Sequence, residues 1–367
     1  MAKRWRRFVV KVGTSSITDD SGRIHPPSMW AIARGASVLA SEHGARFVLV
    51  SSGAGAAGRA ALGVELPLTL PDKQAAAAVG QTLLMLDWSR ALAPRPVAQL
   101  LLSAGDVQDR ERYVNAKHAL EASLELGAVP VVNENDSVAT AELKLGDNDT
   151  LSAWVSYLVD ADALIVLTDV EGLFEADPRS TPGARRIELV RDVSEVEALA
   201  AGAPGERGTG GMATKLRAAR IATDAGIETL VIGGGGAGLE ALARGEVRGT
   251  RFPAKRRTRA RKAWISQQPT HGVVEVDAGA AAALAKGRSL LPRGVSAVRG
   301  DFGFGDAVAL EHAGRTVAVG LSNYGSEALA RIVGRHTSEI AAILGVKDFD
   351  EVVHRDNLTL LETAVLR

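Results

Sequence analysis

Short apolar segments alternate with longer segments rich in alanine and leucine along the first 252 residues of the chain. The short segments are almost continuously apolar, as strands are when helices cover both faces of a parallel sheet. The longer segments are typical of the helices that join such strands. We therefore predict an α/β fold with six strands in one sheet. The predicted strands are residues 8–12, 46–51, 96–101, 129–133, 163–168 and 228–232.

The pattern changes after a basic segment, residues 253–262, which carries six Lys or Arg and no acidic residue. Mutual repulsion makes such a segment a poor core element, so we predict a linker. The short strand-like segments beyond it are residues 272–276, 296–298, 307–310 and 316–321. Separated by glycine turns, they predict a small β-rich barrel or sandwich with one or two helices. The expected organisation is a larger domain at residues 1–252, the linker, and a second domain at residues 263–367.

Composition and charge exclude several function classes. The 367 residues can bury a sizeable core, and 43 Lys plus Arg balance 43 Asp plus Glu, which gives no overall attraction to nucleic acid or anionic lipid. The absence of cysteine excludes disulfides, thiolate nucleophiles and cysteine-based metal sites, and fits a reducing compartment. Gly80, Gln81 and Thr82 interrupt the longest apolar run, which stays short of the roughly 18 residues of a membrane span. Because the N-terminus does not look like a signal peptide, we expect a cytoplasmic protein.

Glycine-rich loops follow several predicted strands, at positions where backbone N–H groups and a helix dipole can hold phosphate. Lys11 and Gly13 end the first strand, and Ser51, Ser52 and Gly53 end the second. A lysine at a strand end can be directed at a phosphate, and hydroxyl groups suit an anion. Each loop alone is also compatible with an ordinary turn or a helix cap.

Two further glycine loops lie closer to the end of the first domain. Residues 208–215 precede a predicted amphipathic helix at residues 216–225, but they do not form a P-loop, because Thr214 stands before Lys215 where that motif needs Gly. Residues 233–238 match GxGxxG by letter. The acidic residue about 20 positions further on that a dinucleotide-binding fold uses is missing. We therefore do not predict dinucleotide binding.

An acidic segment, residues 133–150, follows the fourth predicted strand. It holds Asn-Glu-Asn-Asp at the strand end and Gly-Asp-Asn-Asp ahead of a helix. Its carboxylates are Glu134, Asp136, Glu142, Asp147 and Asp149. They suit either a hard cation such as Mg²⁺ or hydrogen bonds to an amine-bearing substrate or to catalytic lysines, and their spacing fits no EF-hand. Helix capping would account for one of them, so we favour a functional site.

Other catalytic chemistries have little support in the sequence. The seven histidines are scattered, without an HExxH or paired arrangement, which argues against a zinc hydrolase. No GxSxG elbow of a serine hydrolase is present. Thr168 and Asp169, at the end of the fifth predicted strand, offer polar groups to a nucleotide, although they also suit a strand-end turn.

Six motifs combine into a more specific pattern. They are residues 10–15, 52–54, 133–136, 146–149, 167–169 and 208–215. Together they resemble the amino acid kinase family, and within it the bacterial members that phosphorylate glutamate. The C-terminal part, including residues 290–295, looks like the PUA domain that follows the catalytic domain in those members. The resemblance implies an α/β three-layer sandwich with a mainly parallel sheet, plus a small β-rich PUA-like domain.

The resemblance also implies roles for single residues. Lys11 and Lys215 match the lysines that neutralise the transferring phosphoryl group, and Asp149 matches the carboxylate that organises them. Gly55 departs from the family, where a larger apolar residue is usual. The positions that match glutamate-binding residues are Ser52, Asp136 and Asn148. The positions that match nucleotide contacts are Lys11, Gly13, Thr168, Asp169, Thr209, Gly210, Gly211, Met212, Ala213, Thr214 and Lys215.

The reaction implied by the resemblance is ATP- and Mg²⁺-dependent phosphorylation of the γ-carboxylate of L-glutamate, the first step of proline biosynthesis. It also implies feedback inhibition by proline and a homo-oligomer, while no metal ligand is assigned. A carboxyl group with a pKa near 4.3 is already ionised at neutral pH, so no general base is needed. Positioning and charge neutralisation remain as the catalytic work. Because the product is labile, we also expect a contact with the next dehydrogenase of the pathway.

Two alternatives remain open at this point. PUA domains elsewhere often bind RNA, but residues 263–367 carry 10 Lys or Arg against 12 Asp or Glu, so that only the linker is basic. The chain's 5 Trp, 3 Tyr and 7 Phe also leave little to stack on bases. A related acceptor is the nearer alternative: N-acetylglutamate, aspartate, carbamate or UMP. Spacing alone does not separate these from glutamate.

Overall fold

A computed structural model shows how the predicted elements are arranged. It describes residues 4–64, 68–103, 106, 110–138, 148–176, 178, 180–181, 183–196, 211–255, 270–345, 347 and 349–361. The chain divides into two units, Met1–Arg257 and Thr258–Arg367. Most of the predicted linker, residues 256–262, lies outside the described residues. Among the described helices, none combines the length and the apolar character that a membrane crossing requires.

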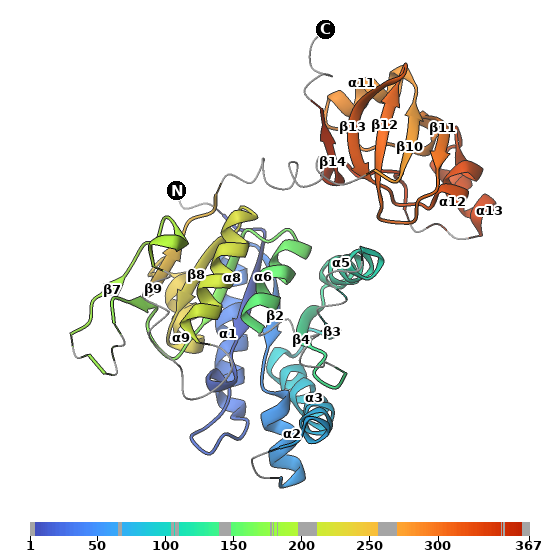
Figure 1. The fold of residues 1–367 in the computed structure, drawn as a ribbon. Coiled ribbons are helices and arrows are strands. Elements are labelled where there is room, and N and C mark those ends of the chain that lie inside the picture. The colour runs from blue at the N-terminus through green and yellow to red at the C-terminus, as the bar shows by residue number, and fades with distance from the viewer. Residues whose placement is uncertain are drawn as a thin grey trace. The chain divides into compact units, whose positions relative to one another are not determined.

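Most strands of the first unit belong to one sheet (Figure 1). The strands of this unit are β1 (Arg7–Val12), β2 (Arg46–Ser51), β3 (Val97–Leu102), β4 (Val129–Glu134), β5 (Ala163–Leu167), β6 (Leu173–Phe174), β7 (Arg186–Ile187), β8 (Glu228–Ile232) and β9 (Gly249–Phe252). The seven-stranded sheet has the order β3-β4-β2-β1-β5-β8-β9. Its pairs are parallel except for β8 with β9 at one edge, and β6 and β7 form a separate hairpin.

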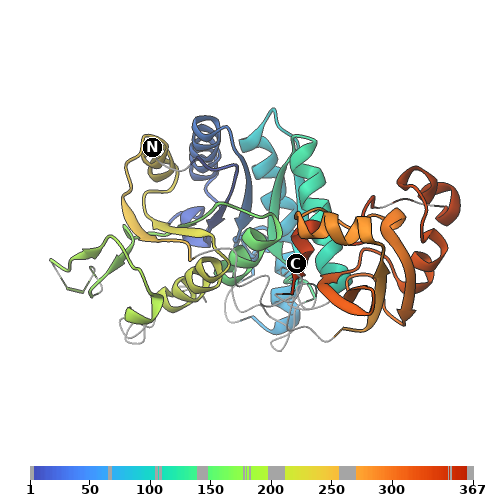
Figure 2. The ribbon, with the colours of Figure 1, turned by 90° about the horizontal axis from the view of Figure 1, so that it is seen from above.

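Helices cover both faces of this sheet. They are α1 (Pro26–His43), α2 (Ala54–Leu62), α3 (Leu70–Leu92), α5 (Arg110–Glu125), α6 (Asn148–Leu158), α8 (Met212–Asp224) and α9 (Gly235–Ala243), with the short 3₁₀ helices η1 (Thr14–Ser16) and η2 (Val193–Glu195). Helix α1 packs against α3 and α9 in one layer, and α6 packs against α5 and α8 in the other. Figure 2 shows the helices on the two sides of the sheet. The predicted α/β architecture, with a mainly parallel sheet between two helical layers, is confirmed.

The alternation of side chains along β1 explains where the site forms. Phe8, Val10 and Val12 are buried in the core that β1 shares with α1, α3 and α9. Successive side chains of a strand point to opposite faces. Val9 and Lys11 therefore lie on the other face, which α6 covers. A lysine in the middle of a buried strand is thus placed between the sheet and a helix.

Helices α2 and α3 approach each other at two glycines. A Cβ atom at Gly58 would lie 1.7 Å from the carbonyl oxygen of Ala76, and one at Gly80 would lie 1.7 Å from that of Ala54. No side chain fits between the two backbones at these points. The contact holds α3 close to the segment that follows β2.

The second unit has its own sheet and core. Its elements are β10 (Gly272–Val276), α11 (Ala278–Ala285), η3 (Pro292–Gly294), β11 (Val295–Gly300), β12 (Ala307–His312), β13 (Arg315–Leu321), α12 (Ser326–Ile332), η4 (Thr337–Glu339), α13 (Ile340–Leu344), η5 (Arg355–Asn357) and β14 (Leu358–Leu360). The five strands are ordered β11-β10-β12-β13-β14, and only β10 with β12 pairs in parallel. Apolar side chains of the strands, α11, α12 and α13 form one core cluster.

The structure corrects four details of the prediction. The first sheet has a seventh strand, β9, whose sequence Gly-Thr-Arg-Phe is too short and polar to indicate a strand. Helix α8 begins at Met212 and not at residue 216, so Thr214 and Lys215 lie in a helix and not in a loop. In the second unit the described strands form a single sheet, including the unpredicted β14, so the sandwich alternative is wrong. That unit has three described α-helices, where one or two were expected.

Candidate active site

Three charged side chains from separate parts of the first unit meet on the face of the sheet that α6 covers. The Nζ atom of Lys11 lies 2.6 Å from Oδ1 of Asp149, and Nζ of Lys215 lies 3.4 Å from Oδ2 of the same carboxylate. Lys11 comes from β1, whereas Asp149 and Lys215 come from the first turns of α6 and α8. Helix α6 packs against both β1 and α8, so the two lysines converge on one carboxylate.

This cluster of Lys11, Asp149 and Lys215 is buried. Their exposed fractions are 6% for Lys11, 0% for Asp149 and 8% for Lys215. Burial raises the pKa of Asp149, but the charges of Lys11 and Lys215, with hydrogen bonds from Lys11 and Thr214, together hold that pKa below its ordinary value. The carboxylate is therefore ionised at neutral pH. It offsets one of two ammonium charges, and the remaining positive charge suits a phosphate group.

The start of α8 adds further donors beside this cluster. The Thr214 hydroxyl lies 2.7 Å from Oδ2 of Asp149 and 2.7 Å from the carbonyl oxygen of Gly211, so it can donate to either. Gly211 precedes the helix and gives no side-chain cap, which leaves the N–H groups of Met212 and Ala213 for another acceptor. Free N–H groups at a helix start, next to an ammonium group, form an anion-binding arrangement. The predicted contacts Thr209 and Gly210 lie outside the described residues.

The predicted nucleotide positions Gly13, Thr168 and Asp169 lie at the same edge of the sheet. Lys11 pairs with Val166 in the parallel register of β1 and β5, so Gly13 and Thr168 both come just after their strands. A Cβ atom at Gly13 would lie 3.4 Å from Nζ of Lys11, so glycine keeps the approach to this ammonium group open. Thr168 is buried and donates to Asp169 across 3.2 Å.

A second polar cluster, the amide cluster, consists of Gln81, Asn133, Asn148 and Ser52. Nδ2 of Asn148 donates to Oγ of Ser52 across 2.8 Å and to Oδ1 of Asn133 across 3.0 Å. Nδ2 of Asn133 donates to Oε1 of Gln81 across 2.9 Å, while its Oδ1 also accepts the backbone N–H of Glu134 across 2.9 Å. These bonds join the end of β2 with α3, β4 and α6.

The lysine and amide clusters adjoin at the start of α6. Asn148 and Asp149 are its first two residues, and each belongs to one cluster. The positive end of a helix dipole stabilises anionic groups at this position. The site therefore has a cationic half next to a neutral, hydrogen-bonding half. Such a division suits the transfer of a phosphoryl group to a polar acceptor.

The other predicted carboxylates are located less fully. Asp136 is half-buried in the turn after β4, two residues beyond Glu134. Its contact with glutamate stays a prediction. Glu142 and Asp147 lie outside the described residues.

Sequence reasoning missed the contribution of α3 to the site. Gln81 belongs to the amide cluster, and Trp88 donates from its indole N–H to Oγ of Ser51 across 2.8 Å. Ser51 in turn donates to the carbonyl oxygen of Ser52 across 3.0 Å. Gln81 interrupts the longest apolar run of the chain. A polar residue on a buried helix face needs a partner, and this signal could have identified Gln81.

The fourth glycine loop serves the packing of helices. A Cβ atom at Gly236 would lie 2.2 Å from the carbonyl oxygen of Ala31, and one at Gly35 would lie 2.5 Å from that of Gly236. Helices α1 and α9 therefore cross in direct backbone contact. This contact gives the glycines of residues 233–238 a structural role.

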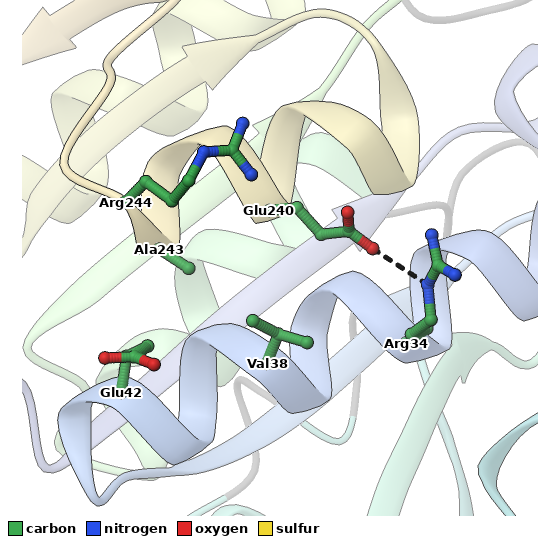
Figure 3. Close-up of a pocket in the computed structure, with 6 residues that line it drawn as sticks. All are labelled: Arg34, Val38, Glu42, Glu240, Ala243 and Arg244. Atoms are coloured by element: carbon green, nitrogen blue, oxygen red, sulfur yellow. Dashed lines mark ion pairs between the residues drawn. The ribbon is translucent and has the colours of Figure 1, made fainter.

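Two surface hollows lie on the helical layer opposite α6 and α8. A groove of about 580 Å³ between α1 and α9 contains Arg34 and Glu240, whose Nε and Oε1 atoms are 2.8 Å apart (Figure 3). A second hollow of about 740 Å³ lies at the C-terminal ends of α1 and α3. Neither contains the lysine cluster, and the groove presents charges of both signs.

The donor groups of the site do not form a resident Mg²⁺ cage. Among the described residues, no three His, Asp or Glu side chains are grouped as metal ligands. Both oxygens of Asp149 are already engaged by ammonium or hydroxyl groups. Mg²⁺ in kinases is held largely by phosphate oxygens and water, with one or two carboxylates. We therefore derive no step from a metal ion held by the protein.

Comparisons with known proteins agree with this geometry. Residues 6–233 match the amino acid kinase family and residues 272–344 match the PUA domain. A glutamate 5-kinase of Moorella thermoacetica is 50% identical over 365 residues, which cover 97% of this chain and 96% of that protein. A glutamate 5-kinase of Thermus thermophilus is 50% identical over 367 residues, which cover 98% of both.

Solved structures of two other kinases are also similar. A UMP kinase from Bacillus anthracis has a TM-score of 0.47 at 14% identity, covering 69% of this chain and 98% of that one. An isopentenyl phosphate kinase has a TM-score of 0.47 at 20% identity, covering 67% and 100%. The family match spans most of the first unit, and the relatives match nearly the whole chain. The resemblance found in the motifs is confirmed: the chain belongs to the amino acid kinase family and carries a PUA domain.

Proposed function

We propose that the protein transfers the γ-phosphoryl group of ATP to the side-chain carboxylate of L-glutamate. The observation that carries this proposal is the convergence of Lys11 and Lys215 on the buried carboxylate of Asp149. Two fixed ammonium groups beside a helix start suit the transferring phosphoryl group. Relatives named glutamate 5-kinase, 50% identical over nearly the whole chain, support glutamate as the acceptor.

The reaction needs no proton transfer to start. A carboxylate oxygen of glutamate, ionised at neutral pH, attacks the γ-phosphorus. The bond from this phosphorus to the β–γ bridging oxygen breaks, and ADP leaves with the electron pair. Lys11 and Lys215 neutralise the charge on the phosphoryl oxygens, while Asp149 keeps the ammonium groups in place before the substrates bind. Mg²⁺ enters as part of the MgATP substrate.

The amide cluster forms the acceptor half in this proposal. Ser52 accepts an N–H of Asn148, so its own hydroxyl hydrogen is available to a carboxylate of glutamate. Asp136 offers a negative charge to the α-ammonium group. Gly13, Thr168, Asp169 and residues 209–215 form the nucleotide half.

The test is to trap the acyl phosphate product with hydroxylamine. Purified protein with MgATP should give a hydroxamate from L-glutamate at a far higher kcat/KM than from aspartate or N-acetylglutamate. ADP formation with carbamate and UMP is measured in parallel, because their products need another assay. A preference for any of these acceptors over glutamate would contradict the proposal.

Further parts of the proposal concern partners and location. Proline acts as feedback inhibitor, the chain forms a homo-oligomer, and the ATP-dependent reaction takes place in the cytoplasm. An acyl phosphate hydrolyses readily, which favours a contact with the next dehydrogenase of the pathway. Purified dehydrogenase that fails to associate with this protein in a pull-down would contradict that contact.

The domain boundaries belong to the same proposal. Residues 1–252 form the catalytic domain, residues 253–262 the linker and residues 263–367 a PUA-like domain with a regulatory or structural role. The slight excess of acidic residues in 263–367 argues against RNA as its ligand. A mobility shift of generic RNA at physiological ionic strength would contradict this role.

A further inference from the structure

We propose that Gln81 is a positioning residue for the acceptor half of the site. It fixes the orientation of the Asn133 amide, and through Asn133 it fixes Asn148 beside Ser52. This inference rests on the proposed function, because Ser52 and Asn148 are assigned to the acceptor there. Gln81 itself lies on α3, away from the strand-end motifs.

The hydrogen bonds of the amide cluster have a single direction. Oε1 of Gln81 can only accept, so Asn133 turns its Nδ2 toward Gln81. Oδ1 of Asn133 then faces Nδ2 of Asn148 and the backbone N–H of Glu134. If the Asn133 amide turned over, a donor would face these two donors. The oxygen of Gln81 therefore decides which atom Asn133 presents to Asn148.

Burial shows that the amide of Gln81 is not explained by stability alone. Gln81 is 8% exposed and Asn133 is 2% exposed. Nε2 of Gln81 is buried without a hydrogen-bond partner among the described residues. An unpaired buried N–H group costs about 1–3 kcal/mol, whereas an apolar side chain of the same length would avoid this cost. The oxygen end of the side chain is the part that the cluster uses.

The packing of α3 makes Gln81 a rigid anchor. Its neighbour Gly80 allows the backbone of α3 to touch that of Ala54, and Trp88 bonds to Ser51 from the same helix. Both contacts hold α3 against the segment that contains Ser52. A site held within fractions of an ångström needs such support behind the residues that touch substrate.

The first experiment compares two substitutions at this position. Gln81→Met removes the acceptor oxygen at nearly constant length, and we expect KM for glutamate to rise about five- to tenfold, while KM for ATP stays unchanged. Gln81→Glu keeps an oxygen facing Asn133 and should restore KM for glutamate to within about twofold of wild type. Gln99→Met, the same change at an exposed site on β3, should change neither constant.

A double-mutant cycle tests whether Gln81 acts through Asn133. In an Asn133→Ala background, Gln81→Met should raise KM for glutamate by less than about twofold further, because the shared bond is already lost. Additive effects would overturn the inference, as would an unchanged KM in Gln81→Met or no rescue by Gln81→Glu. If Gln81→Met does not fold, Gln81→Leu also removes the oxygen and is measured in its place. Wild-type protein inactive on glutamate would contradict the proposed function, whereas active wild type with an unaffected Gln81 variant would contradict this inference alone.

Discussion

The two units of the chain differ in which polar groups they bury. The buried charged residues of the first unit are Lys11, Glu134, Asp149, Asp162 and Lys215. In the described part of the second unit, the buried polar residues are the uncharged Ser322, Asn323 and Thr359. A buried charge is costly unless it is paired, and a well-packed apolar substitute is often at least as stable. Charges gathered in the core of one unit therefore indicate where the chemistry lies.

The partners of these groups sharpen the contrast. In the second unit, Ser322 donates to the carbonyl oxygen of Tyr324, and Asn323 donates to that of Glu351, so both complete local backbone structure. In the first unit, Asp162 has the same kind of role, because it accepts the backbone N–H of Arg6 across 2.7 Å. Lys11 and Lys215, by contrast, share one carboxylate and keep a surplus positive charge. Burial of a charge is informative only together with its partners.

The largest effect is expected from Asp149→Asn. This change leaves two buried ammonium groups without a counter-charge, which should lower the free energy of unfolding by about 3 kcal/mol. Urea unfolding at pH 7 measures the difference. Loss of less than about 0.5 kcal/mol would mean that the cluster is hydrated and that the contrast between the units is overstated.

Removal of either lysine should affect catalysis more than folding. Lys11→Ala and Lys215→Ala should each lower kcat at least about tenfold, or about 1.4 kcal/mol in activation free energy, with the fold retained. Lys255→Ala is the matched control, because Lys255 forms an exposed ion pair with Asp224 at 2.8 Å. Such pairs contribute little, so kcat should stay unchanged. Near-normal turnover in either site variant, measured by ADP release, would break the assignment.

A substitution in the second unit should do the reverse. Tyr324 is buried and its hydroxyl donates to the carbonyl oxygen of Phe349. Tyr324→Phe should lower the stability of this unit by about 1 kcal/mol without changing kcat for glutamate. Thermal unfolding and steady-state kinetics on the full chain provide the two readouts. A fall in kcat comparable with that of the lysine variants would show that the second unit takes part in catalysis.

The smallest expected effect appears in acid. The pKa of Asp149 in the folded protein lies below its ordinary value of 3.8, so its contribution to stability is present above that value. It is lost as the pH falls through the lowered folded pKa. The stability difference between wild type and Asp149→Asn should therefore narrow below about pH 4. A difference that stays constant into that range would show that the carboxylate is not ionised in the folded state.

Sequence patterns located most of the sheet but not its edges. The interior strands β1, β2, β4, β5 and β8 are short apolar runs, and their predicted bounds agree with the structure to within one residue. Burial between two helical layers selects such runs directly. The edge strands β9 and β14 carry no such signal, because their pairing depends on a neighbour that is already in place.

The start of α8 shows a similar limit. Its first residues, Met212 to Lys215, follow glycines and were expected to continue the loop. In the structure the Thr214 hydroxyl and Lys215 both contact Asp149 of α6, and these contacts favour the helical turn. Propensity over a few residues is a weak guide when tertiary contacts are available.

Residue types at strand ends, taken from the sequence alone, identified Lys11, Asp149 and Lys215, because chemistry at this sheet edge requires lysine and carboxylate groups after buried strands. The tertiary structure decided that all three side chains share one buried contact, and that Gln81 of a distant helix orients the amides beside it. Side-chain period and helix starts are local properties that a sequence carries. The direction of an amide depends on which neighbour donates and which accepts, and only folding brings those neighbours together.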